Sequence, residues 1–325
     1  MKTLKPYKLT RETPVEELKG LDSKTKIFIK RDDLNGLIIS GNKARKLEYL
    51  IADAKNKKCD TIITCGAIQS NHCRTAAAFA KHFGFECHLF LRVRGNPRKV
   101  YSGNLLIDEL LGAKVKYVTP SQYERRAEIM KRYAQRSRKK GKTSYVIPEG
   151  GSNEIGALGY VDCMKEMAEF IRRRSIEAVY CAVGSGGTYA GLLLGKKLLD
   201  LRLDLKGVIV CETIEHFKQR IYQICVNAIR KFNLPAEVTY NDIHLIDGYV
   251  GKGYGITYPE ELKTIGNVAK LGIILDPVYT GKAFHGMLND IKKHKYKSVI
   301  FVHSGGIFSI FAYQREITKA IRRSK

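Results

Sequence analysis

Short apolar, β-branched runs alternate with longer helix-like stretches along most of the chain. The short runs predict strands at 25–30, 61–65, 87–92, 114–118, 144–147, 178–183, 207–211 and 298–303. The longer stretches predict helices at 43–55, 71–81, 103–111, 122–139, 155–173, 188–200 and 215–232. Strands and helices that alternate at this spacing form βαβ units. We therefore expect an α/β protein with open, mostly parallel sheets that carry helices on both faces.

Composition places the chain among ordinary globular proteins. Its 325 residues are 44% hydrophobic and 27% charged, and this length suggests about two domains. No repeat, low-complexity tract or Pro/Gly-rich linker marks a domain boundary. No apolar run approaches the ~18 residues that span a bilayer, and the first residues lack the apolar segment of a signal peptide. We expect a cytoplasmic protein with no membrane contact.

The charge is unusual, because 57 Lys and Arg face 32 Asp and Glu, which gives a net charge of +25. Such an excess can indicate a nucleic acid, an anionic surface or an acidic substrate. The most basic stretch, 121–142, is best interpreted as a solvated helix surface, and a nucleic-acid-binding protein is kept as the alternative from another class. The eight cysteines form no Cys-x-x-Cys pair, so we expect reduced, mostly buried thiols and no metal site.

The first turn of chemical interest is Ser40-Gly41-Asn42-Lys43. Asn42 is predicted to cap a helix that begins at Lys43. The positive end of a helix dipole disfavours an ammonium group, so it lowers the pKa of a lysine placed there. A neutral amine is a nucleophile. The local pattern alone still favours a plain surface lysine at this position.

The second turn, 66–74, follows the predicted strand at 61–65 and places Ser70 and Asn71 at a helix N-terminus. Free backbone N–H groups there bind anions such as a carboxylate. Ser70 acting only as an N-cap is the simpler interpretation. Gln69, Ser70, Asn71 and His72 nevertheless put four polar side chains into one turn, which is more than capping requires.

The third turn is Gly184-Ser185-Gly186-Gly187-Thr188, directly after the predicted strand at 178–183. Its glycines allow a ligand to approach the backbone closely, and its amides can form an anion nest. Phosphate is the natural ligand. Tyr189 occupies the place of the third glycine in a dinucleotide fingerprint, and no Gly-Lys-[Ser/Thr] follows. We therefore expect a smaller phosphorylated ligand than a nucleotide.

Ligands of open α/β sheets gather outside the carboxyl ends of the strands. Ser70, Gly184, Thr280 and Ser304 are therefore expected to face one cleft, which the glycine-rich loop 248–255 can help to wall. A reactive lysine together with a small phosphate cradle is the constellation of a pyridoxal-phosphate enzyme.

Six segments, in order over nearly the whole chain, resemble the D-cysteine desulfhydrase / 1-aminocyclopropane-1-carboxylate deaminase family; they lie at 40–49, 66–72, 148–153, 184–188, 275–283 and 303–306. The resemblance implies pyridoxal 5'-phosphate as the cofactor and the tryptophan-synthase-β-like fold (fold type II). It also implies a small domain at 45–155, inserted into a large domain formed by 1–44 and 156–325, and it implies a homodimer.

Residue roles follow from the same resemblance. Lys43 resembles the Schiff-base lysine, Asn71 the residue that lies against the cofactor ring, and Ser304 the hydroxyl that meets the pyridine nitrogen. The phosphate cradle is expected at Gly184, Ser185, Gly186, Gly187 and Thr188. The residues expected to bind substrate are Ser70, Asn71, His72, Tyr254, Tyr279 and Thr280.

Two positions separate the subfamilies in this resemblance. The deaminases carry Glu and Leu where this chain has Thr280 and Ser304, whereas the desulfhydrases carry hydroxyl residues at both. The expected reaction is therefore the conversion of D-cysteine to pyruvate, hydrogen sulfide and ammonia. Lys43 or Ser70 would remove the α-proton, and Tyr279 would protonate the leaving thiolate. The alternatives are 1-aminocyclopropane-1-carboxylate deamination and another amino-acid lyase activity, such as one on cysteate.

Overall fold

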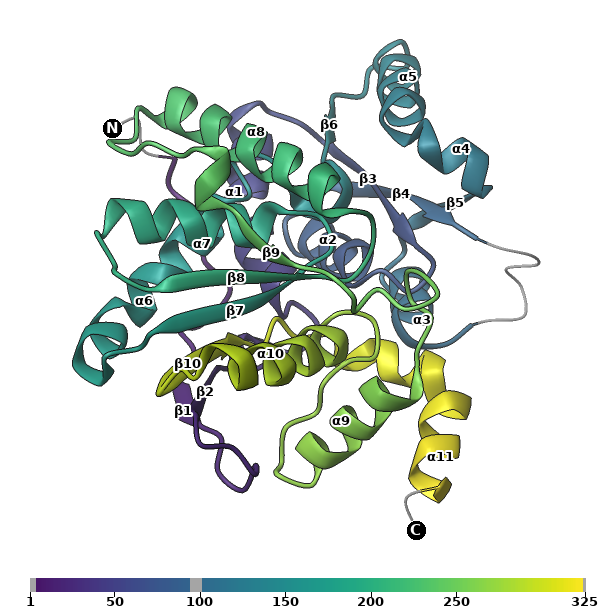
Figure 1. The fold of residues 1–325 in the computed structure, drawn as a ribbon. Helices are drawn as coiled ribbons and strands as arrows, with labels where there is room; N and C mark the ends of the chain where they lie inside the picture. Colours follow the sequence, from purple (N-terminus) through teal and green to yellow (C-terminus); the bar gives the residue numbers. More distant parts are fainter. Residues whose placement is uncertain (1–3, 94–100, 324–325) are drawn as a thin grey trace.

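A computed structural model describes residues 4–93 and 101–323 and contains two open sheets (Figure 1). The six-stranded sheet runs in the order β1-β2-β10-β7-β8-β9, and the four-stranded sheet in the order β5-β4-β3-β6. All strand pairs are parallel except β1 with β2. The predicted α/β fold is confirmed. The strands are β1 (Val15–Glu17), β2 (Lys26–Lys30), β3 (Thr61–Ala67), β4 (Glu86–Arg92), β5 (Lys114–Val118), β6 (Ser144–Val146), β7 (Ala178–Val183), β8 (Asp204–Ile209), β9 (His244–Ile246) and β10 (Ser298–Val302).

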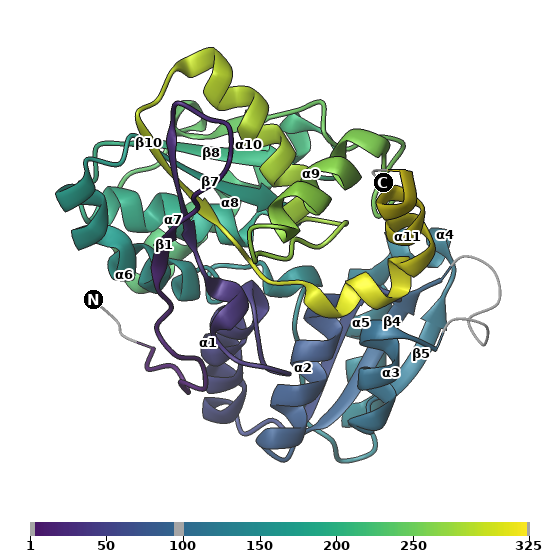
Figure 2. The ribbon, with the colours of Figure 1, turned by 90° about the horizontal axis from the view of Figure 1, so that it is seen from below.

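Helices cover both faces of each sheet (Figures 1 and 2). On the large sheet, α6 (Leu158–Arg174) and α7 (Gly187–Leu198) lie on one face, with α8 (Ile214–Phe232) against α7. The other face carries α10 (Thr280–His294) and α9 (Pro259–Ala269), with α11 (Gln314–Arg323) beside α9. On the small sheet, α2 (Asn71–His82) and α3 (Gly103–Leu110) lie opposite α4 (Pro120–Glu124) and α5 (Arg126–Arg138). Helix α1 (Asn42–Asn56) packs between α6 and α2.

The central strand β7 shows why its sequence is apolar without a break. Successive side chains of a strand point to opposite faces of the sheet. Val179 and Cys181 therefore enter the core under α7, whereas Ala178 and Tyr180 enter the separate core under α10. A strand buried on both faces reads as a continuous apolar run rather than an alternating one. The small sheet has the same arrangement, with Ile62 and Ile63 of β3 on opposite sides.

Two local predictions are wrong. The helix predicted at 122–139 is broken at Arg125 into α4, which a capping box of Thr119 and Gln122 starts at Pro120, and α5. Asn42 does not cap α1, since Gly41 takes that position with a φ of 74°. A Cβ at Gly41 would lie 2.6 Å from the Ser304 carbonyl oxygen, so glycine is required there.

The structure also bears on the expectations about the cysteines, membrane-spanning helices and the small domain. All eight cysteines are free and six of them are buried, as predicted. No helix in the described parts of the chain is long and apolar enough to cross a membrane. The small sheet is built from strands between residues 61 and 146, inside the range predicted for the small domain. The domain boundaries themselves stay a prediction.

Candidate active site

A cavity of about 460 Å³ lies where the carboxyl ends of both sheets meet. Its lining includes Ser70 after β3, Arg92 at the end of β4, Gly184 after β7, Cys211 after β8 and Ser304 after β10. This is the position at which open parallel sheets bind ligands, and the volume suits a small cofactor with its substrate.

The structure brings most of the predicted site residues together at this cavity. Those that line it are Lys43, Ser70, Asn71, His72, Gly184, Ser185, Gly186, Thr188, Tyr254, Tyr279 and Ser304. Gly187 and Thr280 are not part of the lining. The amide of Gly187 donates to Ser152 Oγ (3.2 Å), and the buried Thr280 hydroxyl donates to Asp276 Oδ1 (2.7 Å). A direct contact of Thr280 with substrate stays a prediction.

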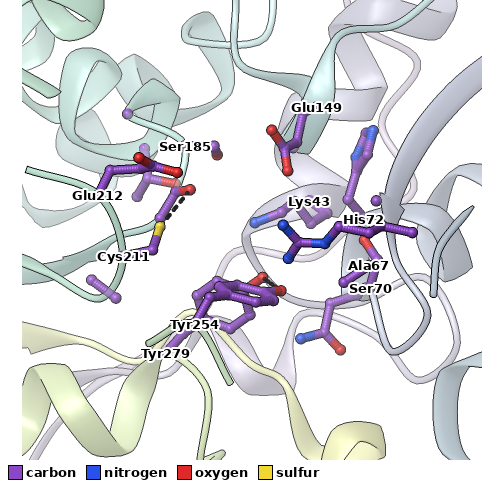
Figure 3. A pocket seen from close by; sticks show the side chains of 18 of the residues that line it. Lys43, Ala67, Ser70, His72, Glu149, Ser185, Cys211, Glu212, Tyr254 and Tyr279 are labelled. Atoms are coloured by element: carbon purple, nitrogen blue, oxygen red, sulfur yellow. Dashed lines mark hydrogen bonds between the residues drawn. The ribbon is translucent and has the colours of Figure 1, made fainter. Parts of the chain in front are cut away.

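Lys43 extends from the first turn of α1 into the cavity, between Glu149 and the tyrosines (Figure 3). Its Nζ donates to Asn42 Oδ1 (3.0 Å) and lies 5.7 Å from the ring centre of Tyr279. Burial lowers the pKa of Lys43 to about 8, although the negative charges of Asp276 and Glu149 act in the opposite direction. A sizeable neutral fraction of this amine therefore exists near neutral pH, as a nucleophile or a base requires.

Lys46, which the sequence analysis missed, lies behind the cavity wall and contacts it through Gly150. It is fully buried, and its Nζ donates to the Gly150 carbonyl (3.3 Å) and to Ser152 Oγ (3.1 Å). It has no carboxylate partner among the residues that the structure describes. Burial lowers the pKa of Lys46 well below its usual value, and the charge of nearby Lys43 lowers it further. The spacing of three residues from Lys43, which puts both side chains on neighbouring parts of one helix face, was the available signal.

The glycine turn after β7 is positioned by close packing. Gly186 has a φ of +84° and precedes the first turn of α7. A Cβ at Gly184 would lie 2.8 Å from Tyr279 Cε1, and a Cβ at Gly187 would lie 2.6 Å from Ser152 Oγ. Side chains at these positions would therefore collide with Tyr279 and with Ser152.

Ser152 connects this turn to Lys46. Its Oγ lies 2.8 Å from Ser185 Oγ and accepts the amide of Gly187, while it also receives a hydrogen bond from Lys46. The amides at the start of α7 and a buried lysine with no carboxylate partner in the described chain thus lie at the same place. An anion, and a phosphate in particular, fits this arrangement.

The helix N-terminus after β3 forms a second polar wall. Ser70 is the N-cap of α2, as the simpler interpretation predicted, and its Oγ accepts the amide of Cys73 (3.2 Å). Asn71 is held by Asn104, whose Nδ2 donates to Asn71 Oδ1 (2.9 Å). Both side chains also line the cavity, so the capping role does not remove them from the site.

His72 is neutral, and its hydrogen bonds define its tautomer. The Thr64 hydroxyl donates to the Ile147 carbonyl (2.9 Å), so it can only accept from Nε2 of His72 (2.8 Å). Nδ1 is therefore unprotonated, and within the described chain it is buried without a partner. Burial lowers the pKa of His72 well below its usual value, and the charges of Lys43 and Lys46 act in the same direction.

Two tyrosines, Tyr254 and Tyr279, form the wall of the cavity that lies across Lys43 from Glu149 (Figure 3). The hydroxyls of Tyr254 and Tyr279 are hydrogen-bonded to each other. Burial raises the pKa of both phenols, so both remain protonated and can act as acids. The buried carboxylate of Asp276 accepts the amides of Val278, Tyr279 and Thr280 and thereby fixes Tyr279 at the start of α10.

Comparisons with known proteins agree with this geometry. A protein-family model described as "Pyridoxal-phosphate dependent enzyme" matches residues 7–305. A Thermotoga maritima protein named "Putative 1-aminocyclopropane-1-carboxylate deaminase" is 43% identical over 94% of this chain and 97% of its own length. The "D-cysteine desulfhydrase" of Klebsiella pneumoniae is 39% identical over 93% of each chain.

A solved structure gives the same result at the level of the fold. The structure described as "Crystal Structure Analysis of the ACC deaminase homologue" has a TM-score of 0.90 and 34% identity, and the match covers 97% of this chain and 96% of that one. The chain therefore belongs to the pyridoxal-phosphate-dependent enzymes, in the family of the 1-aminocyclopropane-1-carboxylate deaminases and D-cysteine desulfhydrases.

Proposed function

We propose that this chain eliminates the thiol of D-cysteine and releases pyruvate, hydrogen sulfide and ammonia. The observation that carries the proposal is an amine with a lowered pKa, Lys43, that faces the protonated tyrosine Tyr279 across one cavity. An elimination needs this pair of groups, one to accept a proton and one to donate it. Bound pyridoxal phosphate supplies an aldehyde that holds the substrate amine and a ring that takes up electrons from the α-carbon.

Residues of the chain bind the cofactor phosphate and the substrate and transfer the protons. The turn at 184–188, supported by Lys46, holds the phosphate, and the N-terminus of α2 with Ser70 orients the substrate carboxylate. Neutral Lys43 accepts the α-proton, and Tyr279 gives a proton to the departing sulfur. Ser70 is the alternative base. A Ser70→Ala variant that still binds substrate but no longer exchanges the α-proton with solvent would favour Ser70.

The choice of substrate rests on Thr280 and Ser304, the two positions that separate the subfamilies in the resemblance. Ser304 lines the cavity, and the Thr280 hydroxyl donates to Asp276. Deamination of 1-aminocyclopropane-1-carboxylate is the second candidate, favoured by the names of the Thermotoga maritima relative and of the similar solved structure. A homodimer, implied by the family resemblance, and a cytoplasmic location, expected from the sequence, are further proposals.

The test supplies the loaded enzyme separately with D-cysteine, L-cysteine, cysteate and 1-aminocyclopropane-1-carboxylate, and measures ammonia and sulfide. We expect turnover of D-cysteine with one sulfide per ammonia. Turnover of the cyclopropane substrate alone would show a deaminase instead. Lys43→Ala is expected to lose at least about 1,000-fold in kcat, because it removes a covalent anchor and a base. Borohydride, which reduces an imine to a stable amine, should attach the cofactor to the wild type and not to this variant.

A further inference from the structure

Arg92, the last residue of β4, is a cation in the cavity that the proposed reaction has not used. Its guanidinium carbon lies 5.0 Å from the ring centre of Tyr123 and 5.4 Å from that of Tyr254. Throughout residues 4–93 and 101–323 no carboxylate pairs with it and no acceptor receives its side-chain N–H groups. Cation–π contacts of a guanidinium with two rings use none of its N–H donors, so these donors stay available for a ligand.

Arg126 provides the contrast within the same cavity. It too lies against the ring of Tyr123, at 4.9 Å, but its Nη2 forms an ion pair with Glu149 Oε2 (3.0 Å). Its Nη1 also donates to the Tyr123 carbonyl (3.1 Å). Glu149 therefore neutralises the charge of Arg126. The charge of Arg92 meets no carboxylate in the described chain and is available to a ligand in the cavity.

The position of Arg92 indicates which part of a ligand it meets. Tyr254, one of its two ring partners, is hydrogen-bonded to Tyr279, the proposed proton donor to the leaving group. Its charge also acts on a sulfur in the cavity wall: burial raises the pKa of the Cys211 thiol to about 12, and Arg92 works against that rise. Arg220, another cation of the lining, lies beside Gly186 at the phosphate turn instead.

We propose that Arg92 stabilises the negative charge on the leaving group and so determines which β-substituted amino acids are eliminated fastest. The inference rests on the proposed function. In the step, the base takes the α-proton, a double bond forms between Cα and Cβ, and the Cβ–S bond breaks with its electron pair on sulfur. Tyr279 then protonates the thiolate. Arg92 transfers no proton; its fixed charge lowers the energy of the anion before that proton arrives.

The experiment compares leaving groups of different basicity in wild type, Arg92→Gln and Arg92→Lys. The substrates are β-chloroalanine, S-aryl cysteines with substituted rings, and cysteine, all of the enantiomer that the wild type accepts. Chloride needs little stabilisation, so its kcat/KM should fall less than about 3-fold in Arg92→Gln. The thiolate of cysteine is the most basic leaving group and should lose about 100-fold, the effect of removing one fixed anion-stabilising donor. Arg92→Lys should recover part of this loss, because it restores the charge without the planar fork.

Lys116 offers a matched control, because it is also a cation over a tyrosine ring, 5.0 Å from that of Tyr133, but lies outside the cavity. Lys116→Gln should leave the dependence on the leaving group unchanged. Cofactor absorbance equal to that of the wild type would show that Arg92→Gln is folded and loaded. An equal loss for all leaving groups would overturn the inference. A wild type that eliminates chloride but not thiol would instead contradict the proposed function, and the other substrates would still test Arg92.

Discussion

Arg45 and Lys46 are consecutive residues of α1, and both are almost completely buried. Arg45 donates to Asp32 and to both carboxylate oxygens of Glu166, at 2.7 to 2.9 Å. Among the residues that the structure describes, Lys46 reaches only a carbonyl and a hydroxyl. Burial without a counter-ion there disfavours the charged amine and lowers its pKa, so the retention of a lysine points to a bound anion that would restore its charge. Arg45 thus stabilises the fold, whereas Lys46 is the residue that we propose supports a bound anion.

The paired cation belongs to a cluster that fixes α1. Lys30 of β2 pairs with Glu166 of α6 at 2.7 Å, and the Tyr160 hydroxyl donates to Asp32 at 2.7 Å. Arg45 sits between the two carboxylates. Because Lys43 lies two residues earlier on the same helix, this cluster also sets where its amine enters the cavity.

The largest effect is expected for Arg45→Met, which leaves Asp32 buried without its principal partner. Breaking a buried pair in this way costs about 3–5 kcal/mol of unfolding free energy. Urea unfolding of the cofactor-free protein measures it. The double variant Arg45→Met/Asp32→Asn should recover part of the loss, because it removes the stranded charge. Equal stabilities for the wild type and the single variant would show that the cluster does not hold the fold.

Lys46→Met should have the opposite profile. Because burial lowers the pKa of Lys46 well below its usual value, the cofactor-free fold disfavours the charged amine, so Met at similar volume should keep the unfolding free energy of the cofactor-free protein within about 1 kcal/mol of wild type, or raise it. Pyridoxal phosphate affinity should instead fall about 10- to 100-fold, as for one lost charge-assisted hydrogen bond of ~1.5–3 kcal/mol. Absorbance titration measures the affinity, and inorganic phosphate should compete less well against the cofactor in the variant. Unchanged affinity with lowered stability would make Lys46 a structural residue like Arg45.

Local sequence signals were sufficient to locate residues whose place in the cavity follows from a single turn. The strand-turn-helix pattern located Ser70 and the turn at 184–188, and the resemblance singled out Lys43. Arg92 and Glu149 escaped because the rings and charges around them come from distant segments, such as Tyr254 for Arg92. The strands β1 and β9, of three residues each, are too short to give a periodic signal. The start of α4 at Pro120 depended on a capping box just ahead of an otherwise helical pattern.

The smallest effect is a pH dependence in the cofactor-free protein: the stability contributed by Lys43 should change with pH, whereas that contributed by Arg45 should not. The pKa of Lys43 is about 8 in the folded state and about 10.5 when unfolded. Between these values the unfolded chain holds more protons, so the stability contributed by Lys43 rises with pH. Above about pH 8, the unfolding free energy of wild type should therefore rise relative to that of Lys43→Met, by at most ~1.4 kcal/mol per pH unit. Below about pH 8, the two curves of unfolding free energy against pH should be parallel.

The same comparison with Arg45→Met should show no such change, because a guanidinium stays protonated throughout this range. The thiols and phenols that titrate above pH 8 are common to all three proteins, so they cancel in the differences. Because the charge of Lys43 also shifts the pKa of Lys46, all three proteins carry Lys46→Met in this comparison. Urea unfolding at half-unit steps from pH 7 to 10 provides the measurement. Parallel curves for Lys43→Met and wild type would mean that the amine keeps an ordinary pKa in the fold. Its role as a base at neutral pH would then require the bound cofactor to lower that pKa.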